Sequence, residues 1–244
     1  MPGSPLRDLA AQASGSAPAA TVVDRVAAAV RTDILSGTLA PGTPLREESA
    51  SARYGVSRHT VRAAFQRLVN ERLAVAEPYR GVRVTSFDRA HVIALQQLRA
   101  ALEVEAVRIA RERYGEEWPD VALEAAREAL DALDRLDAEG APAAGDAADA
   151  DADHVSDSVD WLEVERVHAD FHRALVAASD SPRIIEAHAA LGSELLLFLL
   201  HVRPHYTLAS LIAEHRALLD EIPVRGPDAL REHLEHSTRL LVGS

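Results

Sequence analysis

The 244-residue chain contains no cysteine and no lysine, and aromatic residues make up only 4% of it. The lack of cysteine excludes disulfide bonds, thiolate metal sites and cysteine nucleophiles. No apolar run approaches the roughly 18 residues that a membrane-spanning helix needs. The N-terminal residues lack the basic stretch followed by an apolar stretch that marks a secretion signal. We therefore expect a cytoplasmic protein with no membrane partner.

The formal net charge of −12 is unevenly distributed along the chain. Residues 1–86 hold 11 arginines and 7 acidic residues, so they carry +4, whereas residues 87–244 hold 15 arginines and 31 acidic residues and carry −16. This asymmetry indicates two domains with different partners, of which the basic one faces an anion.

The first 86 residues predict a leader followed by a small domain. Residues 1–20 are rich in Ala, Ser, Pro and Gly, and we expect them to be disordered. Residues 21–86 predict three helices and then a β-hairpin, with a turn at Pro41–Pro44 between the first two helices. The expected helices are 21–36, 46–54 and 57–70, and the expected strands are 73–77 and 82–85. Three helices followed by a hairpin form a winged helix-turn-helix, whose third helix enters the major groove of DNA.

The start of the third helix carries the polar residues that this geometry turns toward DNA. Arg58 and Arg62 are four residues apart and share a helix face, and arginine binds a guanine edge or a phosphate. The hairpin tip at residues 79–81 is short enough to reach a minor groove or the backbone. The alternative interpretation is that these arginines form an ordinary solvated face. The order of three helices and a hairpin argues against it.

Two segments of this domain resemble the N-terminal module of GntR-family transcription regulators. They are Ile34–Glu47 (ILSGTLAPGTPLRE) and Tyr54–Arg62 (YGVSRHTVR), and with the hairpin the resemblance covers about residues 22–86. Together with the polar helix start, the resemblance implies DNA contacts at Arg46, Ser57, Arg58, His59, Thr60, Arg62, Arg80 and Gly81.

Residues 87–244 predict an all-α helical bundle, so the fold is expected to be mainly α. Residues 140–158 contain Ala, Asp, Gly and Pro with almost no large apolar side chain, and we expect a flexible acidic loop there. Apolar residues recur at helical spacing elsewhere. The expected helices are 90–114, 119–138, 159–179, 182–202, 207–222 and 227–241.

Ten of the eleven histidines follow residue 87. His168 and His172 are four residues apart on an apolar helix face, where a pair without partners is costly and a divalent metal ion would use both neutral imidazoles. His215 lies on a second apolar stripe, and the last helix carries two more histidines. Three helices could therefore bring four imidazoles together in a bundle. The alternative is an ordinary core or rim histidine at each position, and we expect His188 and His205 at the surface.

Three segments resemble helices of the FCD effector domain of the FadR-like subfamily. They are Val167–Leu175 (VHADFHRAL), Glu214–Leu219 (EHRALL) and Leu98–Glu103 (LRAALE), and the resemblance covers about residues 88–242. Many of these domains hold a divalent metal, commonly zinc, through one Asp and three His beside a small carboxylate. The resemblance implies metal ligands at His168, His172, His215 and His236, and dimerisation through this domain.

The chain departs from that pattern at two of the implied ligands. The acidic position is occupied by His168, which leaves a bound dication its full charge, so we expect stronger attraction for an anion or selection of a nitrogen-preferring metal such as Ni²⁺. The spacing from His215 to the last ligand is about one residue short, which makes His233 a rival to His236. Arg99 could bind an effector carboxylate through both guanidinium nitrogens, and its alternative is an ion pair with Glu103.

The expected function is a ligand-responsive transcription regulator, acting as a repressor, whose homodimer binds a palindromic operator in double-stranded DNA. A small organic acid that prefers the arrangement unable to bind DNA would lower operator affinity. One alternative is a vestigial metal site in a domain that serves only dimerisation. Another is a zinc hydrolase, but the H-E-x-x-H and G-x-S-x-G motifs are missing, so we do not expect an enzyme.

Overall fold

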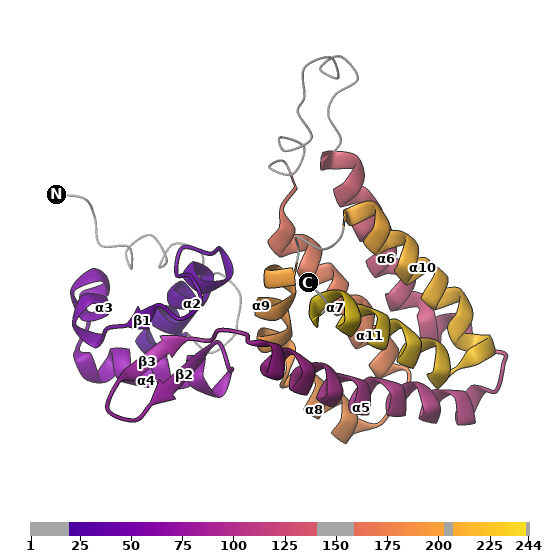
Figure 1. The fold of residues 1–244 in the computed structure, drawn as a ribbon, viewed down its shortest axis with the longest axis horizontal. Coiled ribbons are helices and arrows are strands. Elements are labelled where there is room, and N and C mark those ends of the chain that lie inside the picture. Colours follow the sequence, from indigo (N-terminus) through magenta and orange to yellow (C-terminus); the bar gives the residue numbers. More distant parts are fainter. Residues whose placement is uncertain (1–19, 141–158, 203–206, 243–244) are drawn as a thin grey trace, which may run out of the picture. The chain divides into compact units, whose positions relative to one another are not determined.

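The structure, a computed structural model, describes residues 20–140, 159–202 and 207–242. Apart from Ala20 and Gly140, the expected leader and acidic loop lie outside these ranges, as does His205. The chain divides into two compact units, Met1–Phe87 and Asp88–Ser244 (Figure 1). Among the described residues, no helix combines the length and the apolar character needed to cross a membrane.

The described part of the first unit, from residue 20 onward, contains three helices and a small sheet, which confirms the predicted winged helix-turn-helix. Helix α2 begins after a capping box in which Thr21 and Asp24 bond reciprocally. Its apolar stripe packs on α4, and both helices contribute to the core of this unit. The elements are α2 (Val22–Leu35), β1 (Pro44–Leu45), α3 (Glu47–Tyr54), α4 (Arg58–Asn70), β2 (Ala74–Glu77) and β3 (Gly81–Val84).

The sheet has one strand more than the sequence predicts. Strand β3 lies between β1 and β2 and is antiparallel to both. The segment expected to be only a turn joins β3 because Gly42 N–H donates to the Val84 carbonyl and Val84 N–H donates to the Thr43 carbonyl, both at 3.0 Å. This pairing anchors the base of the hairpin, so its tip is carried on a three-stranded support.

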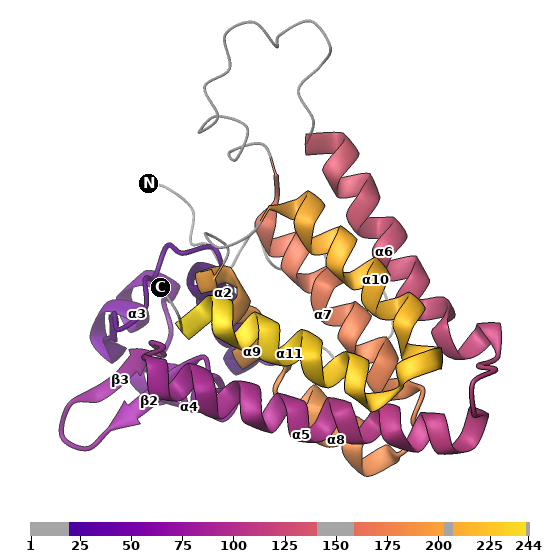
Figure 2. The ribbon, with the colours of Figure 1, turned by 45° about the vertical axis from the view of Figure 1, so that its right-hand side comes forward.

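The second unit is a helical bundle in which α7 packs against α5, α6, α8 and α9. Helix α11 runs along α5, and α10 packs on α6 and α11 (Figures 1 and 2). The described elements are α5 (Arg89–Tyr114), α6 (Asp120–Gly140), α7 (Trp161–Ala177), α8 (Pro182–Ala189), α9 (Gly192–Val202), α10 (Leu208–Arg225) and α11 (Pro227–Val242).

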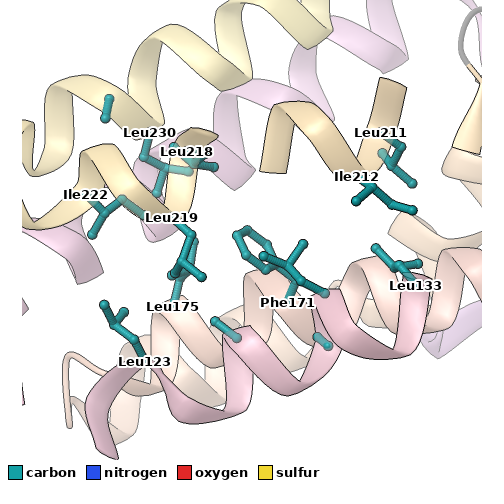
Figure 3. Packing of buried hydrophobic residues seen from close by; sticks show 14 of the residues in the cluster. Leu123, Leu133, Phe171, Leu175, Leu211, Ile212, Leu218, Leu219, Ile222 and Leu230 are labelled. Carbon is teal, nitrogen blue, oxygen red and sulfur yellow. The ribbon is translucent and has the colours of Figure 1, made fainter. Parts of the chain in front are cut away.

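The core of the bundle lies between α6, α7, α10 and α11. Phe171 and Leu175 project from α7 into leucines and isoleucines of the neighbouring helices (Figure 3). Phe171 is completely buried, and its ring meets those of His172 and His215 edge to face, with centroids 5.3 and 5.1 Å apart. The apolar core therefore directly supports the histidines beside it.

Two helix boundaries in this unit differ from the expectation. The predicted helix 182–202 is two helices, α8 and α9, because the chain turns at Ala190–Leu191 before Gly192, which is a poor helix former. Helix α10 continues past Pro223 to Arg225. Arg111 donates to the carbonyls of Pro223 and Val224 and packs against Gly226, where a side chain would clash with it.

Candidate nucleic-acid interface and metal centre

The start of α4 presents a polar surface because its apolar residues face inward. Ser57 caps the helix by accepting a hydrogen bond from Thr60 N–H at 3.1 Å. Val61, Phe65 and Leu68 are buried, whereas Ser57, Arg58, His59 and Arg62 are exposed and Thr60 is half-buried. The N-terminal turn of this helix is thus open to a partner.

Both arginines of this surface pair with glutamates at the start of α3. Arg62 donates from Nε and Nη2 to the two carboxylate oxygens of Glu47, at 2.7 and 2.8 Å. Arg58 donates from Nη2 to Glu48 at 3.0 Å. Exposed ion pairs contribute roughly 0 to 1 kcal/mol, so a phosphate or a base can displace them at small cost. The paired residues are 10 and 15 positions apart in the chain, so no local pattern predicts these contacts.

The remaining predicted DNA contacts lie at the hairpin tip and at the N-terminus of α3. Arg80 and Gly81 are exposed at the tip, where Tyr79 and Gly81 have φ values of +64° and +85°. Glycine adopts such a φ without strain, and it allows the tight turn. Arg46 is exposed at the N-cap of α3.

In the helical unit, α7 and α10 bring three buried histidines together. His168 and His172 lie one turn apart on α7, and His215 comes from α10. One potential ligand atom from each residue lies within 4.8 Å of the other two. The structure therefore brings together three of the four histidines that the resemblance implies.

Each of the three imidazoles is held through its Nδ1 atom. His168 Nδ1 lies 3.0 Å from a Glu165 carboxylate oxygen, and His172 Nδ1 lies 2.9 Å from one of Glu103. His215 Nδ1 lies 2.7 Å from the Leu211 carbonyl. An ionised carboxylate or a carbonyl can only accept, so these contacts favour a proton on Nδ1 and a free lone pair on Nε2.

The three Nε2 atoms lack suitable partners among the described residues. His168 Nε2 is buried with no hydrogen-bond partner. His172 Nε2 and His215 Nε2 face each other at 3.2 Å. Two lone pairs cannot form a hydrogen bond, so a cation satisfies this arrangement better than the protein atoms do.

Burial lowers the pKa of His168, His172, His215 and His233. The pKa of His172 falls to about 4, first because of burial and second because of the nearby Arg99 guanidinium. Burial also holds the pKa of His168, His215 and His233 well below the ordinary value. The imidazoles are therefore neutral at pH 7, which is the form that binds a metal ion.

On α11 the His233 ring lies close to the other imidazoles, whereas the His236 side chain is exposed. The His233 ring lies 4.6 Å from that of His215 and 5.6 Å from that of His172, measured between centroids. The His236 side chain is 49% exposed and its Nε2 lies 4.0 Å from a Glu214 oxygen. These positions favour His233 over His236 as the candidate last ligand, because α11 turns the His233 ring toward the other imidazoles.

Arg99 lies beside the histidines in a buried charge network. Its Nε donates to Glu103 at 2.7 Å, which is the ion pair considered as its alternative role. Glu103 also contacts His188 Nε2 at 2.9 Å, so His188 is buried instead of lying at the surface. Burial alone would raise the pKa of Glu103, but Arg99, His172 and His188 outweigh it and hold that pKa well below its ordinary value.

Sequence reasoning missed two supporting residues, Glu165 and His188. Glu165 precedes His168 by three residues, and this helical spacing was a usable signal. His188 meets Glu103 across 85 positions of sequence, so only the tertiary fold reveals that contact.

Comparisons with known proteins agree with both units. Residues 22–84 match the family described as bacterial regulatory proteins, gntR family, and residues 94–239 match the FCD domain. The chain is 25% identical over 218 residues to the "Probable D-xylose utilization operon transcriptional repressor" of Paenarthrobacter nicotinovorans, covering 88% of this chain and 85% of that protein. It is 40% identical over 74 residues to the HTH-type transcriptional repressor RspR of Escherichia coli (strain K12). That match covers 30% of this chain and 32% of that protein.

A solved structure extends the similarity over both units. The structure of a GntR transcriptional regulator from Rhodococcus sp. RHA1 aligns with a TM-score of 0.67 and 26% identity, covering 91% of this chain and 98% of that one. The fold and the family matches agree along the sequence, and none of the relatives compared is named as an enzyme. The chain belongs to the GntR family, carries an FCD domain and is a transcriptional regulator.

Proposed function

We propose that this regulator senses a small organic acid through a divalent metal ion held by His168, His172, His215 and His233. The observation that carries the proposal is the convergence of three buried imidazoles whose Nδ1 atoms are already engaged. Their Nε2 atoms are left as ligands, and neutral imidazoles in this number suit zinc or nickel.

The acid is proposed to bind where the metal and Arg99 act on the same carboxylate. A bound dication supplies positive charge, and its four proposed ligands are neutral imidazoles. Nε of Arg99 donates to Glu103, and the proposal assigns the terminal nitrogens of that guanidinium to the carboxylate of the ligand. These interactions favour a small anion over a neutral ligand.

The cavity beside Arg99 has a volume of only about 20 Å³, which is room for about one water molecule. Arg99, His172, His188 and Leu195 are among its lining residues. An organic acid must therefore move side chains of the unit to enter. Such a ligand selects a different arrangement of the helices, and this difference is the source of linkage to DNA binding.

DNA is proposed to contact the exposed residues at the start of α4, the hairpin tip and Arg46. Arg58 and Arg62 are the main candidates for base or phosphate contacts, with Ser57, His59 and Thr60 beside them on the same helix. We propose that Arg80 and Gly81 at the hairpin tip contact a groove edge or the DNA backbone. We further propose that a homodimer binds a palindromic operator, because the two-fold symmetry of a dimer matches the two-fold symmetry of such a site.

Repression is the proposed outcome, and the names of two relatives as repressors support it. Calorimetry against a panel of small carboxylates, with zinc-loaded and chelator-stripped protein, tests the sensing function. We expect at least one acid to bind only the loaded protein and to lower its affinity for a promoter fragment. Metal binding without any acid response would support a structural metal, and no metal binding would support a vestigial site in a dimerisation domain.

A further inference from the structure

Two buried carboxylates lie on the Nδ1 side of the histidine group, away from the Nε2 atoms. Glu165 and Glu103 are both 0% exposed, and each contacts the Nδ1 atom of one imidazole, His168 or His172. We propose that Glu165 and Glu103 are positioning residues of the metal centre: they fix the ligand tautomer of the two imidazoles and supply negative charge to the bound cation. This inference rests on the proposed metal binding.

The tautomer of each imidazole depends on whether the partner of its Nδ1 atom can donate a proton. We take both carboxyl groups as ionised in this proposal; an ionised carboxylate has no proton to give, so the imidazole beside it must donate from Nδ1 and keep its Nε2 lone pair. For His215 the neutral Leu211 carbonyl has the same effect. Carboxylate, carboxylate and carbonyl thus set three imidazoles in one tautomer before any metal arrives, and no ligand has to rotate or exchange its proton.

The burial of the histidine group creates a need for negative charge near the bound cation. A dication surrounded only by neutral imidazoles in a dry interior is poorly compensated. Glu165 and Glu103 each lie one imidazole away from the Nε2 atoms, and a hydrogen-bonded carboxylate makes the imidazole a stronger electron donor. The four imidazole ligands carry no negative charge, so Glu165 and Glu103 supply it through their contacts with His168 and His172.

Helix α7 places Glu165 suitably for this task. Residues 165, 168 and 172 lie along the same side of one helix, so the carboxylate precedes its imidazole by about one turn. Glu103 reaches His172 from α5, where Arg99 and His188 also hold it. One supporting carboxylate is thus local in sequence and the other is tertiary.

Glu165 is the better residue to test, because replacing Glu103 would also release Arg99. Glu165→Gln keeps an oxygen that accepts from Nδ1 but removes the charge, and Glu165→Met removes both. The matched control is Glu194→Gln, since Glu194 is a buried carboxylate bonded to His91 Nε2 at 2.9 Å, a histidine that does not belong to the group.

The first measurement is ¹⁵N NMR of the imidazoles in the full-length, metal-free protein at pH 7, with His168 assigned from a His168→Gln spectrum. We expect a protonated Nδ1 at His168 in the native protein and in Glu165→Gln, and loss of this preference in Glu165→Met. A His168 protonated on Nε2 in the native protein overturns the inference without any reference to metal binding.

The second measurement is zinc affinity by competition with a chelator. Loss of such a supporting partner typically costs 10- to 100-fold in metal affinity, so we expect about 10-fold for Glu165→Gln and about 100-fold for Glu165→Met. Glu194→Gln should bind zinc as the native protein does. If Glu165→Met does not fold, as judged by circular dichroism without metal, the isosteric Glu165→Gln variant decides.

The outcomes separate the two proposals. Native protein that binds zinc while both Glu165 variants bind it equally well refutes the positioning role and leaves the metal centre intact. Native protein that binds no zinc, cobalt or nickel refutes the metal centre and the positioning role with it.

Discussion

The Nε2 atoms of His172 and His215 face each other across 3.2 Å in the interior of the helical unit. Glu103 and the Leu211 carbonyl engage the two Nδ1 atoms, so the facing nitrogens both carry lone pairs. A cation between or beside them removes this repulsion. The geometry thus connects the stability of the bundle to metal binding.

Zinc should therefore stabilise the native protein against unfolding. A ligand at 100 times its Kd stabilises the folded state by about 2.7 kcal/mol, provided that the unfolded chain does not bind it. Thermal unfolding in zinc and in a chelator measures this difference. The double variant His172→Ala, His215→Ala should lose it, and an equal zinc effect in both proteins would place the metal elsewhere.

The pair His233 and His236 offers a matched test of the last ligand. Both belong to α11 and both substitutions to alanine remove one imidazole, but only His233 contacts the rings of His172 and His215. We expect His233→Ala to weaken zinc binding by at least 10-fold, as for a residue that contributes to the centre. His236→Ala should leave it unchanged, and the reverse result would restore the assignment implied by the resemblance.

The order and type of nearly all elements could be predicted, because amphipathic periodicity and caps are local properties of sequence. The two-residue strand at Pro44–Leu45 could not, since β1 exists only through its pairing with β3. The break between α8 and α9 has only Gly192 as a local signal, and one glycine within an apolar stretch is weak.

Local spacing in the sequence predicts only part of the candidate metal centre. The spacing of His168 and His172 places them on one face without any knowledge of the fold. His233 and His236 are three residues apart and share much of a helix face, so only the orientation of α11 distinguishes them. The contact of His188 with Glu103 joins α8 to α5, and no local pattern indicates it.

Mild acid should destabilise the metal-free protein. The pKa of His172 falls from 6.5 to about 4 on folding, so the unfolded chain binds more protons between these values. The contribution of His172 to the free energy of unfolding is therefore present above pH 6.5 and is lost as the pH falls toward 4. For His172 alone the loss between pH 7 and pH 5 is of the order of 2 kcal/mol.

Urea unfolding of chelator-treated protein at these two pH values measures the acid effect. In His172→Asn the side-chain amide can still donate to Glu103 but does not titrate, so its stability should depend less on pH. An unchanged dependence in this variant would assign the acid sensitivity to other groups.

DNA binding should depend on Arg62 more than on Arg67 of the same helix. Arg62→Ala removes an exposed guanidinium from the first part of α4, and loss of a base contact costs about 1–3 kcal/mol, or roughly 10- to 100-fold in affinity. Arg67→Ala is the matched control, because it removes the same charge from the same helix five residues further on, where the arginine pairs with Asp24. Fluorescence anisotropy with a promoter fragment measures both variants.

The salt dependence of the same titrations distinguishes what Arg62 contacts. If Arg62 binds a phosphate, the slope of log affinity against log salt should become shallower by about one unit and the loss should be uniform across sequences. If it reads a guanine, the slope should change little and discrimination should relax at one operator position. Glu47 holds Nε and Nη2 of Arg62 and leaves the Nη1 side open, which suits a base edge. Equal losses in Arg62→Ala and Arg67→Ala would contradict both contacts and leave only the general charge of the domain.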